Sequence, residues 1–113
     1  GHAVGDAVIT AAADRARDYL DDDALIARFG GDEVLVVLPH VPGLEAALGI
    51  AEGVRQAIAT TVTIPATGEE IQTGVSVGIA LLHPGESVDE VISRADTAMY
   101  QAKTEGRNAV AIA

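Results

Sequence analysis

The sequence lacks cysteine and tryptophan and has few aromatic residues of any kind. Without cysteine the chain can form neither a disulfide framework nor a thiolate metal site, which fits a reducing compartment. Its aromatic residues are two Tyr and one Phe, whereas 49% of the chain is hydrophobic. The core must therefore be filled by Ala, Val, Ile and Leu.

Positive charge is also scarce. Seven Lys and Arg stand against seventeen Asp and Glu, which gives a formal net charge of -10. A chain this acidic repels phosphate backbones, so we expect no broad binding of nucleic acid or anionic membranes. A phosphate ligand would have to be held by a few locally placed cations or by a metal ion.

Long apolar runs are missing as well. The run "VLVVL" at 34–38 is far shorter than the roughly 20 residues that span a bilayer, and the start lacks the basic-then-apolar form of a signal peptide. We expect a cytoplasmic chain, although the full gene product can carry a membrane anchor. At 113 residues the sequence predicts one domain over 1–113, since domains commonly have about 100–150 residues.

The spacing of apolar residues predicts an α+β fold in which helices pack on one sheet, as in α/β and ferredoxin-like folds. Helices are expected at about 6–19, at 43–59, and from Ser87 to Gly106, where Glu90 completes a capping box. Strands are expected at 24–29, 33–38, 61–64, 69–82 and 109–112, with the first two forming a hairpin and 69–82 holding a short strand and a central one.

The tip of that hairpin combines two glycines with two carboxylates, in the stretch "RFGGDEVLVV" at 28–37. Gly30 and Gly31 allow a tight turn and the close approach of a ligand to the backbone. Asp32 and Glu33 are oxygen ligands of the kind that Mg²⁺ takes together with substrate phosphates. A solvated turn is the alternative, because Gly-Asp turns are among the commonest hairpin connections.

Four blocks of sequence resemble the GGDEF family, the diguanylate cyclase domain. They are "GHAVGD" at 1–6, "RFGGDEV" at 28–34, "SVGIA" at 76–80 and "ADTAMYQAKTEGRN" at 95–108, in the order and approximate spacing of that family. The resemblance implies a fold like that of nucleotidyl cyclase and polymerase palm domains. It also implies that two domains, each holding one GTP, face one another to make cyclic di-GMP and release two pyrophosphates.

The resemblance assigns roles to residues at the hairpin tip. Gly30 and Gly31 would lie close to the nucleotide. Asp32 would bind Mg²⁺ or Mn²⁺ near the attacking 3′-hydroxyl and help to deprotonate it, with Glu33 as the supporting carboxylate. The partners implied are GTP, a second GGDEF domain, and sensor or effector domains attached in the longer protein.

Three further residues receive roles from the same resemblance. Lys103 and Arg107, expected one helical turn apart on the last helix, match family residues that hold the triphosphate, and the alternative for both is a solvated helix end. Asp6 matches the acidic residue that recognises the guanine edge, and its alternative is a helix N-cap.

The sequence departs from the family pattern in three places. The family domain starts upstream with a strand that carries a second metal-binding aspartate, so we expect this chain alone to have little or no cyclase activity. It would be either a piece of a longer gene product, which we favour, or a chain that pairs with another copy. Val34 replaces the motif's Phe, and Asp21 and Ala24 replace the Arg and Asp of the family's product-inhibition site, so we expect no product feedback there.

The sequence is therefore consistent with two functions. The first is the catalytic region of a diguanylate cyclase. The second is a non-catalytic GGDEF module that binds GTP or dimerises to regulate attached domains. Asp32, Glu33, Lys103 and Arg107 favour the enzyme, whereas Val34 leaves room for the module.

Overall fold

The computed structural model describes residues 2–29 and 33–113. Within these ranges it has helices and strands in the order α1 (His2–Tyr19), β1 (Leu25–Arg28), β2 (Val34–Val37), α2 (Leu44–Ile58), β3 (Thr61–Thr63), β4 (Glu70–Gln72), β5 (Val77–Ile79), α3 (Val88–Thr104) and β6 (Val110–Ile112). Every helix and strand expected from the sequence is present, and the run 69–82 holds two strands, as expected.

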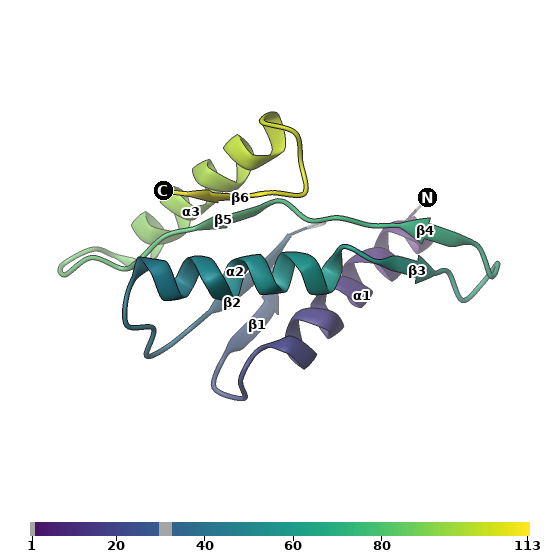
Figure 1. The fold of residues 1–113 in the computed structure, drawn as a ribbon, viewed down its shortest axis with the longest axis horizontal. Helices are drawn as coiled ribbons and strands as arrows, with labels where there is room; N and C mark the ends of the chain where they lie inside the picture. The colour runs from purple at the N-terminus through teal and green to yellow at the C-terminus, as the bar shows by residue number, and fades with distance from the viewer. Residues whose placement is uncertain (1, 30–32) are drawn as a thin grey trace.

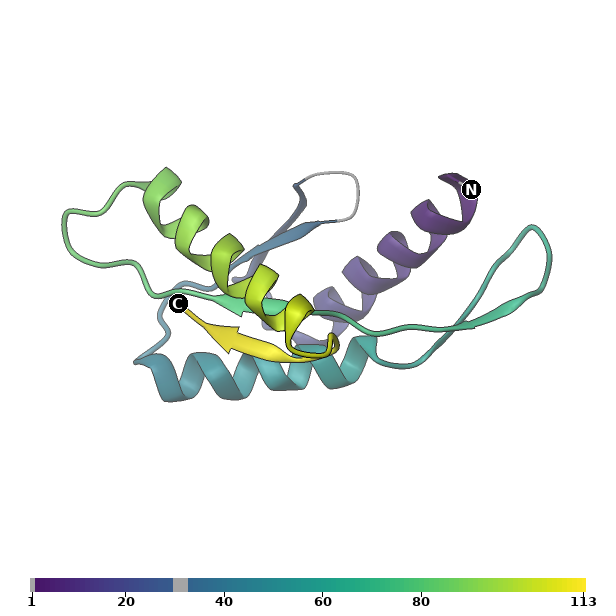
Figure 2. The ribbon, with the colours of Figure 1, turned by 90° about the horizontal axis from the view of Figure 1, so that it is seen from above.

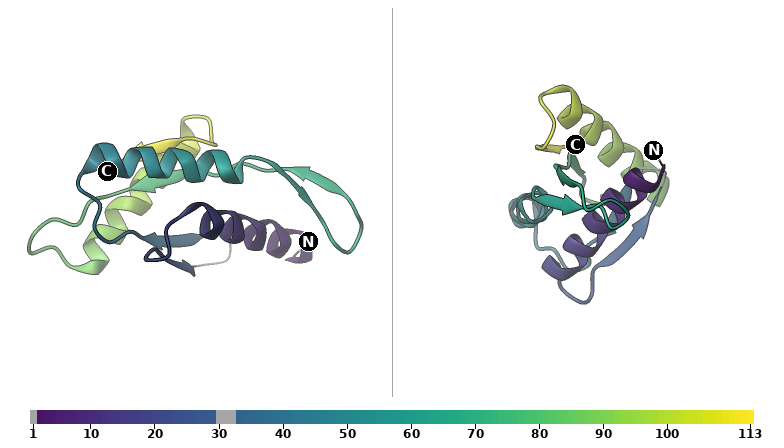
Figure 3. Two further views of the ribbon diagram at one scale, coloured as in Figure 1. Left: turned by 60° about the horizontal axis from the view of Figure 1, so that its bottom comes forward. Right: turned by 90° about the vertical axis from the view of Figure 1, so that its right-hand side faces the viewer.

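The helix α2 runs through the middle of the molecule. It packs against α1 on one side and against β5 and β6 on the other. Figure 1 shows β5, β6 and α3 above α2, with α1, β1 and β2 below it. The hairpin of β3 and β4 reaches out beyond the end of α2 (Figure 3).

The strands differ from the single sheet that the sequence predicts. In the described residues they form three two-stranded sheets, in which β1 pairs with β2, β3 with β4, and β5 with β6. The first two pairs are antiparallel and the third is parallel. In the described residues, no strand of one pair is hydrogen-bonded to a strand of another pair. Contacts with the helices therefore hold the three sheets together.

The core is built from small aliphatic side chains, as the composition predicts. The buried hydrophobic residues of the described ranges are Ala16, Ala47, Ala51, Ile58, Val62, Ile64, Ala98 and Ala102. Five of these eight are alanines, which let helix backbones approach one another and the strands closely.

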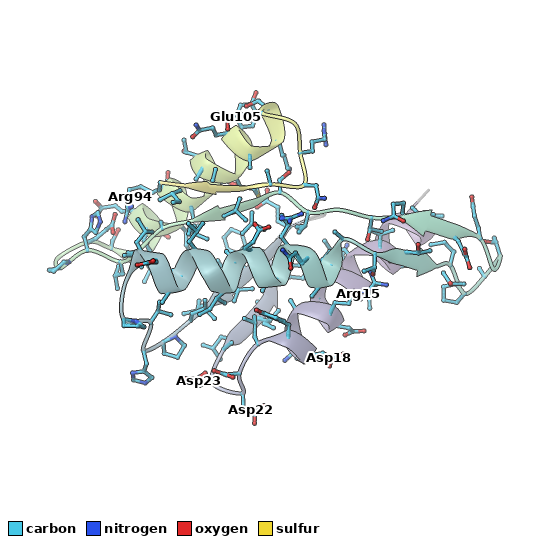
Figure 4. The ribbon with its side chains drawn as sticks, viewed as in Figure 1. Arg15, Asp18, Asp22, Asp23, Arg94 and Glu105 are labelled. Carbon is cyan, nitrogen blue, oxygen red and sulfur yellow. The ribbon has the colours of Figure 1, made fainter. Side chains whose placement is uncertain are left out.

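An arginine of α1 fastens the end of α2. The Arg15 guanidinium donates to the carbonyl oxygens of Ile58 at 3.1 Å and Thr61 at 2.6 Å. Figure 4 shows Arg15 beside the point where α2 gives way to β3. Because helix carbonyls at a C-terminus lack helical partners, this contact stabilises α2 and orients the β3–β4 hairpin.

The helix α3 lies directly on β5 and β6 (Figure 2). It begins at Ser87, whose side chain accepts from the Glu90 N–H while the Glu90 carboxylate accepts from the Ser87 N–H, so the predicted capping box is confirmed. Gly78 allows the close contact, because a Cβ there would overlap the Ala95 carbonyl oxygen and the Met99 backbone nitrogen.

Replacing Gly78 by alanine should therefore be strongly destabilising. The obstructing atoms belong to the α3 backbone, so β5 and α3 must move apart, at an expected cost of about 1–3 kcal/mol in the free energy of unfolding. Urea denaturation followed by circular dichroism measures the change.

The matched control is Gly49→Ala on the exposed face of α2, where a Cβ meets nothing within 4 Å. It should gain roughly 0.5–1 kcal/mol, because alanine is the better helix former. Equal stability changes in the two variants would contradict the close contact at Gly78.

Candidate functional site

The hairpin predicted around the signature is present. Leu25 pairs with Val37 and Arg28 with Val34. The Phe29 N–H then donates to the Glu33 carbonyl oxygen at 2.8 Å, which brings the two strand ends together. The roles expected of Gly30, Gly31 and Asp32 fall outside the described residues and stay predictions.

Asp6 lies inside α1, four residues after the helix begins at His2, so the N-cap alternative is wrong. The apolar residues at helical spacing were recognised only from Gly5 onward, so the sequence did not reveal that the helix begins at His2. The Asp6 Oδ1 accepts a hydrogen bond from the Arg28 Nη2 at 2.8 Å. The Asp6 and Arg28 side chains are 63% and 45% exposed respectively.

Packing of α1 against β1 explains why these residues meet. The chain reverses between the two elements, where the Ala24 N–H donates to the Asp21 carbonyl oxygen at 3.0 Å. The start of α1 and the far end of β1 therefore lie on the same side of the molecule (Figure 2). Asp6 and Arg28, 22 residues apart in sequence, come into contact there.

The sequence interpretation assigned no role to Arg28. One signal could have singled it out, because Arg28 is the charged residue in the otherwise apolar stretch "ALIARF" at 24–29. A charged side chain near the end of a strand, two residues before a glycine turn, is a candidate for a contact at the tip.

Lys103 and Arg107 are not one turn apart on a helix, as the sequence suggested. Lys103 lies in the last turn of α3, whereas Arg107 follows the helix end. Gly106 has φ 129° and Arg107 φ 63°, so the backbone leaves the helix through left-handed conformations. The Arg107 N–H then donates to the Ala102 carbonyl oxygen at 3.1 Å, which fixes the turn against α3.

Lys103 and Arg107, like Arg15 and Arg17, differ from the arginines of the described residues that form ion pairs. Arg55 and Arg94 form ion pairs with Glu52 and Glu86 on or beside their own helices. No ion pair with a described carboxylate involves Lys103 or Arg107. Within residues 2–29 and 33–113, these two cations of an acidic chain thus have no carboxylate counter-ion.

Three aspartates lie away from the end of α3, whereas Glu105 is the residue that follows the helix, between Lys103 and Arg107 in sequence. Figure 4 shows Asp18, Asp22 and Asp23 at the lower end of the molecule, where α1 passes into β1, and Glu105 at the opposite, upper end. The three aspartates therefore lie far from the end of α3 in this view, and their repulsion of an anion there is screened by distance and salt.

The described residues contain no group of three or more His, Asp or Glu side chains placed to hold a metal ion. This does not conflict with Mg²⁺ as a ligand, because Mg²⁺ is usually held by one or two carboxylates together with water and substrate phosphates. Glu33 is the described carboxylate at the tip, and its donor chemistry fits such an ion. No helix of the described ranges is long and apolar enough to cross a membrane.

The family model described as "Diguanylate cyclase, GGDEF domain" matches residues 1–109. The chain belongs to the GGDEF family. Its resemblance to that family, first inferred from four sequence blocks, is confirmed over nearly the whole chain.

Curated relatives share this GGDEF region as part of longer proteins. Diguanylate cyclase DgcM of Escherichia coli is 38% identical over 110 residues, which cover 97% of this chain and 26% of DgcM. Diguanylate cyclase DgcP of Pseudomonas aeruginosa is 38% identical over 113 residues, which cover 100% of this chain and 16% of DgcP.

Solved GGDEF structures have the same fold. The GGDEF domain of PA1120 (YfiN or TpbB) from Pseudomonas aeruginosa matches with a TM-score of 0.92 at 33% identity, over 100% of this chain and 70% of that one. The GGDEF domain of DgcB from Caulobacter crescentus, in complex with c-di-GMP, matches with a TM-score of 0.88 at 32% identity, over 99% of this chain and 66% of that one. The predicted α+β nucleotidyl-cyclase fold is thereby confirmed.

An ion pair holds the loop that leads into α3 of this GGDEF chain. Arg94 donates through Nε and Nη2 to the two carboxylate oxygens of Glu86 at 2.7 Å each, and its Nη2 also donates to the Leu81 carbonyl oxygen. The Arg94 hydrogen bonds, and then the His83 N–H, lower the pKa of Glu86 to about 2 from 4.5. Figure 4 shows Arg94 on the α3 side of the molecule.

This low pKa predicts a pH dependence of stability. Glu86 binds a proton more readily in the unfolded chain than in the folded one, so its contribution is present above pH 4.5 and is lost as the pH falls from 4.5 to about 2. The variant Glu86→Gln should show a flatter decline of the unfolding free energy over that range.

Denaturant titrations at several pH values measure this decline, and Arg94→Gln serves as the matched partner variant. Since Arg94 causes the shift, its loss should flatten the profile in the same way, and the double variant should add little. Parallel pH profiles for the wild type and Glu86→Gln would contradict the role of the pair.

Proposed function

We propose that this chain is the nucleotide-binding and catalytic region of a diguanylate cyclase, which condenses two GTP into cyclic di-GMP and releases two pyrophosphates. The observation that carries the proposal is the pair of cations at the end of α3, Lys103 and Arg107, which have no ion pair with a described carboxylate. In a family whose relatives include named diguanylate cyclases, a triphosphate is the counter-ion that suits them.

The proposed roles divide between the hairpin and the end of α3. Lys103 and Arg107 bind the triphosphate and neutralise charge that develops on it during phosphoryl transfer. Gly30 and Gly31 let the nucleotide approach the backbone. Asp32, with Glu33 in support, accepts the proton of the attacking 3′-hydroxyl.

The reaction also defines what must be bound beside the GTP. Mg²⁺ or Mn²⁺ held by Asp32, with Glu33 as the supporting carboxylate, would supply charge neutralisation at the phosphates and activation of the hydroxyl. A second GGDEF domain brings the second GTP, because each 3′-hydroxyl must attack the α-phosphate of the other nucleotide. The relatives are several times longer than this chain, so we propose that attached sensor or effector domains control the pairing.

A non-catalytic GGDEF module is the second candidate. Val34, which stands where the motif has Phe, favours it. Val34 is the first residue of β2 and pairs with Arg28, so the smaller side chain lies next to the contact between Arg28 and Asp6. Such a module would bind GTP through the same cations without condensing it.

Incubation of the full-length gene product with Mg²⁺ and GTP, scored for cyclic di-GMP, tests the proposal. The variant Asp32→Ala should lose activity by about 100-fold or more, the usual contribution of a general base. Asp22→Asn, which changes an exposed loop carboxylate, is the matched control and should keep wild-type turnover.

The outcomes separate the two candidates. Product from the wild type and from Asp22→Asn, with none from Asp32→Ala, supports the cyclase. Tight GTP binding without product in any of the three proteins supports the module. Absence of GTP binding in the wild type contradicts the cyclase and a GTP-binding module, and leaves a module that acts by dimerisation.

Product feedback through the stretch 21–24 should be absent. Asp21 and Ala24 form a turn there, closed by the hydrogen bond between their backbones, and neither side chain can bind a phosphate as the family's Arg does. Cyclic di-GMP should therefore leave initial rates unchanged, whereas Asp21→Arg combined with Ala24→Asp should introduce inhibition. Tight cyclic di-GMP binding that survives Asp32→Ala would contradict this expectation.

A further inference from the structure

The turn that joins α3 to β6 has a rare backbone conformation. Gly106, Arg107 and Asn108 have φ values of 129°, 63° and 45°, so three consecutive residues lie at positive φ. Glycine and asparagine adopt such φ values readily, whereas arginine seldom does. A non-glycine residue keeps this conformation only where the surrounding structure holds it, so contacts with the rest of the fold must fix Arg107.

One side of the turn is anchored to α3. The Arg107 N–H donates to the Ala102 carbonyl oxygen at 3.1 Å. With Gly106 at positive φ, this is the long hydrogen bond of a Schellman motif, which commonly ends a helix. The motif accounts for the conformation of Gly106, but it does not require that Arg107 and Asn108 follow with positive φ.

Asn108 anchors the other side of the turn to the segment that enters β5. Its Oδ1 accepts a hydrogen bond from the Val75 N–H at 3.4 Å. Its side chain also lies against Gly74, where a Cβ would stand 3.1 Å from both the Asn108 Cβ and Cγ. Figure 1 shows the chain turning back from the end of α3 into β6, next to β5. The turn is thus fastened to the strands as well as to the helix.

The segment that receives Asn108 is itself anchored. Thr73, one residue before Gly74, donates through Oγ1 to the Ile58 carbonyl oxygen at 2.8 Å and through its N–H to the Thr60 carbonyl oxygen at 3.1 Å. Ile58 is the last residue of α2. Asn108 therefore contacts a segment that is held in place by the end of another helix.

We propose that Asn108 is a positioning residue, which fixes the turn after α3 and thereby directs the Arg107 side chain towards the triphosphate. The proposal rests on the proposed function, in which Arg107 binds phosphate. Arg107 is exposed, so the direction of its side chain depends on the backbone that carries it. Asparagine suits the position because its side chain is short, has an acceptor oxygen and tolerates positive φ.

Binding measurements on the full-length gene product test the inference. The probes are GMP and the GTP analogue with a methylene group between the α- and β-phosphorus atoms, which cannot release pyrophosphate, each with Mg²⁺. Both contain guanosine and the α-phosphate, so the ratio of their dissociation constants reports contacts with the β- and γ-phosphates. Arg107→Ala should lower the preference for the triphosphate by about tenfold or more, the effect of losing a hydrogen bond between charged groups.

The variant Asn108→Gly removes the side-chain contacts and still permits positive φ. It should lower the same preference by about fivefold, as expected for the loss of one neutral hydrogen bond, and should leave the affinity for GMP unchanged. In the Arg107→Ala background it should have no further effect, because Asn108 acts through Arg107. His40→Gly is the matched control, since His40 also has a positive φ, 62°, and it should leave the ratio unchanged.

The variant Gly74→Ala tests the same contact from the opposite side. The added Cβ crowds the Asn108 side chain without removing it, so the preference for the triphosphate should fall in the otherwise wild-type chain. In the Asn108→Gly background the same change should have no effect. Circular dichroism checks that each variant is folded.

Two results would overturn the inference and leave the proposed function intact. One is an Asn108→Gly variant with the wild-type ratio, while Arg107→Ala loses the preference for the triphosphate. The other is an Asn108→Gly variant that weakens both ligands in equal proportion, or whose effect persists in the Arg107→Ala background, as expected of a merely structural residue. A wild type without a preference for the triphosphate, or an Arg107→Ala variant that keeps it, would instead contradict the role of Arg107 in the proposed function.

Discussion

The chain has only seven basic side chains, against seventeen acidic ones. Two of them hold the fold together at particular points. Arg15 binds the carbonyls at the end of α2, and Arg94 holds Glu86 in front of α3. Arg28 at the end of β1 contacts Asp6 of α1. Lys103 and Arg107 have no ion pair with a described carboxylate, and the proposed triphosphate would supply the missing negative charge.

The packing of the molecule depends on small residues. Five alanines in the buried core and Gly78 under α3 let helices approach the strands closely. Helix contacts can thus hold together three pairs of strands that do not form one sheet in this chain. The elements that carry Asp6, Arg28 and Lys103 are positioned by those helix contacts, so stability and site geometry share the same physical basis.

Much of the local structure could be predicted because its causes are local. The capping box of Ser87 and Glu90 and the helix end near Gly106 depend on side chains and backbone conformations within a few residues. Predictions that required distant contacts were less reliable. Arg107 was expected on the helix, but the left-handed turn at Gly106 places it beyond the end. A single sheet was expected from the alternation of helices and strands. That alternation indicates layers of structure but does not say which strands pair, and the strands form three separate pairs in the described residues.

The amino-acid sequence alone indicated the family and the chemistry available to the chain, because four motif blocks and the residue types within them can be read without coordinates. It also indicated the hairpin on which Glu33 lies, since two short runs of β-forming residues on either side of a glycine turn are a local pattern. Only the tertiary structure decided that Arg28 meets Asp6. That contact joins residues 22 positions apart, and it exists because the chain reverses after α1 and packs β1 back along it.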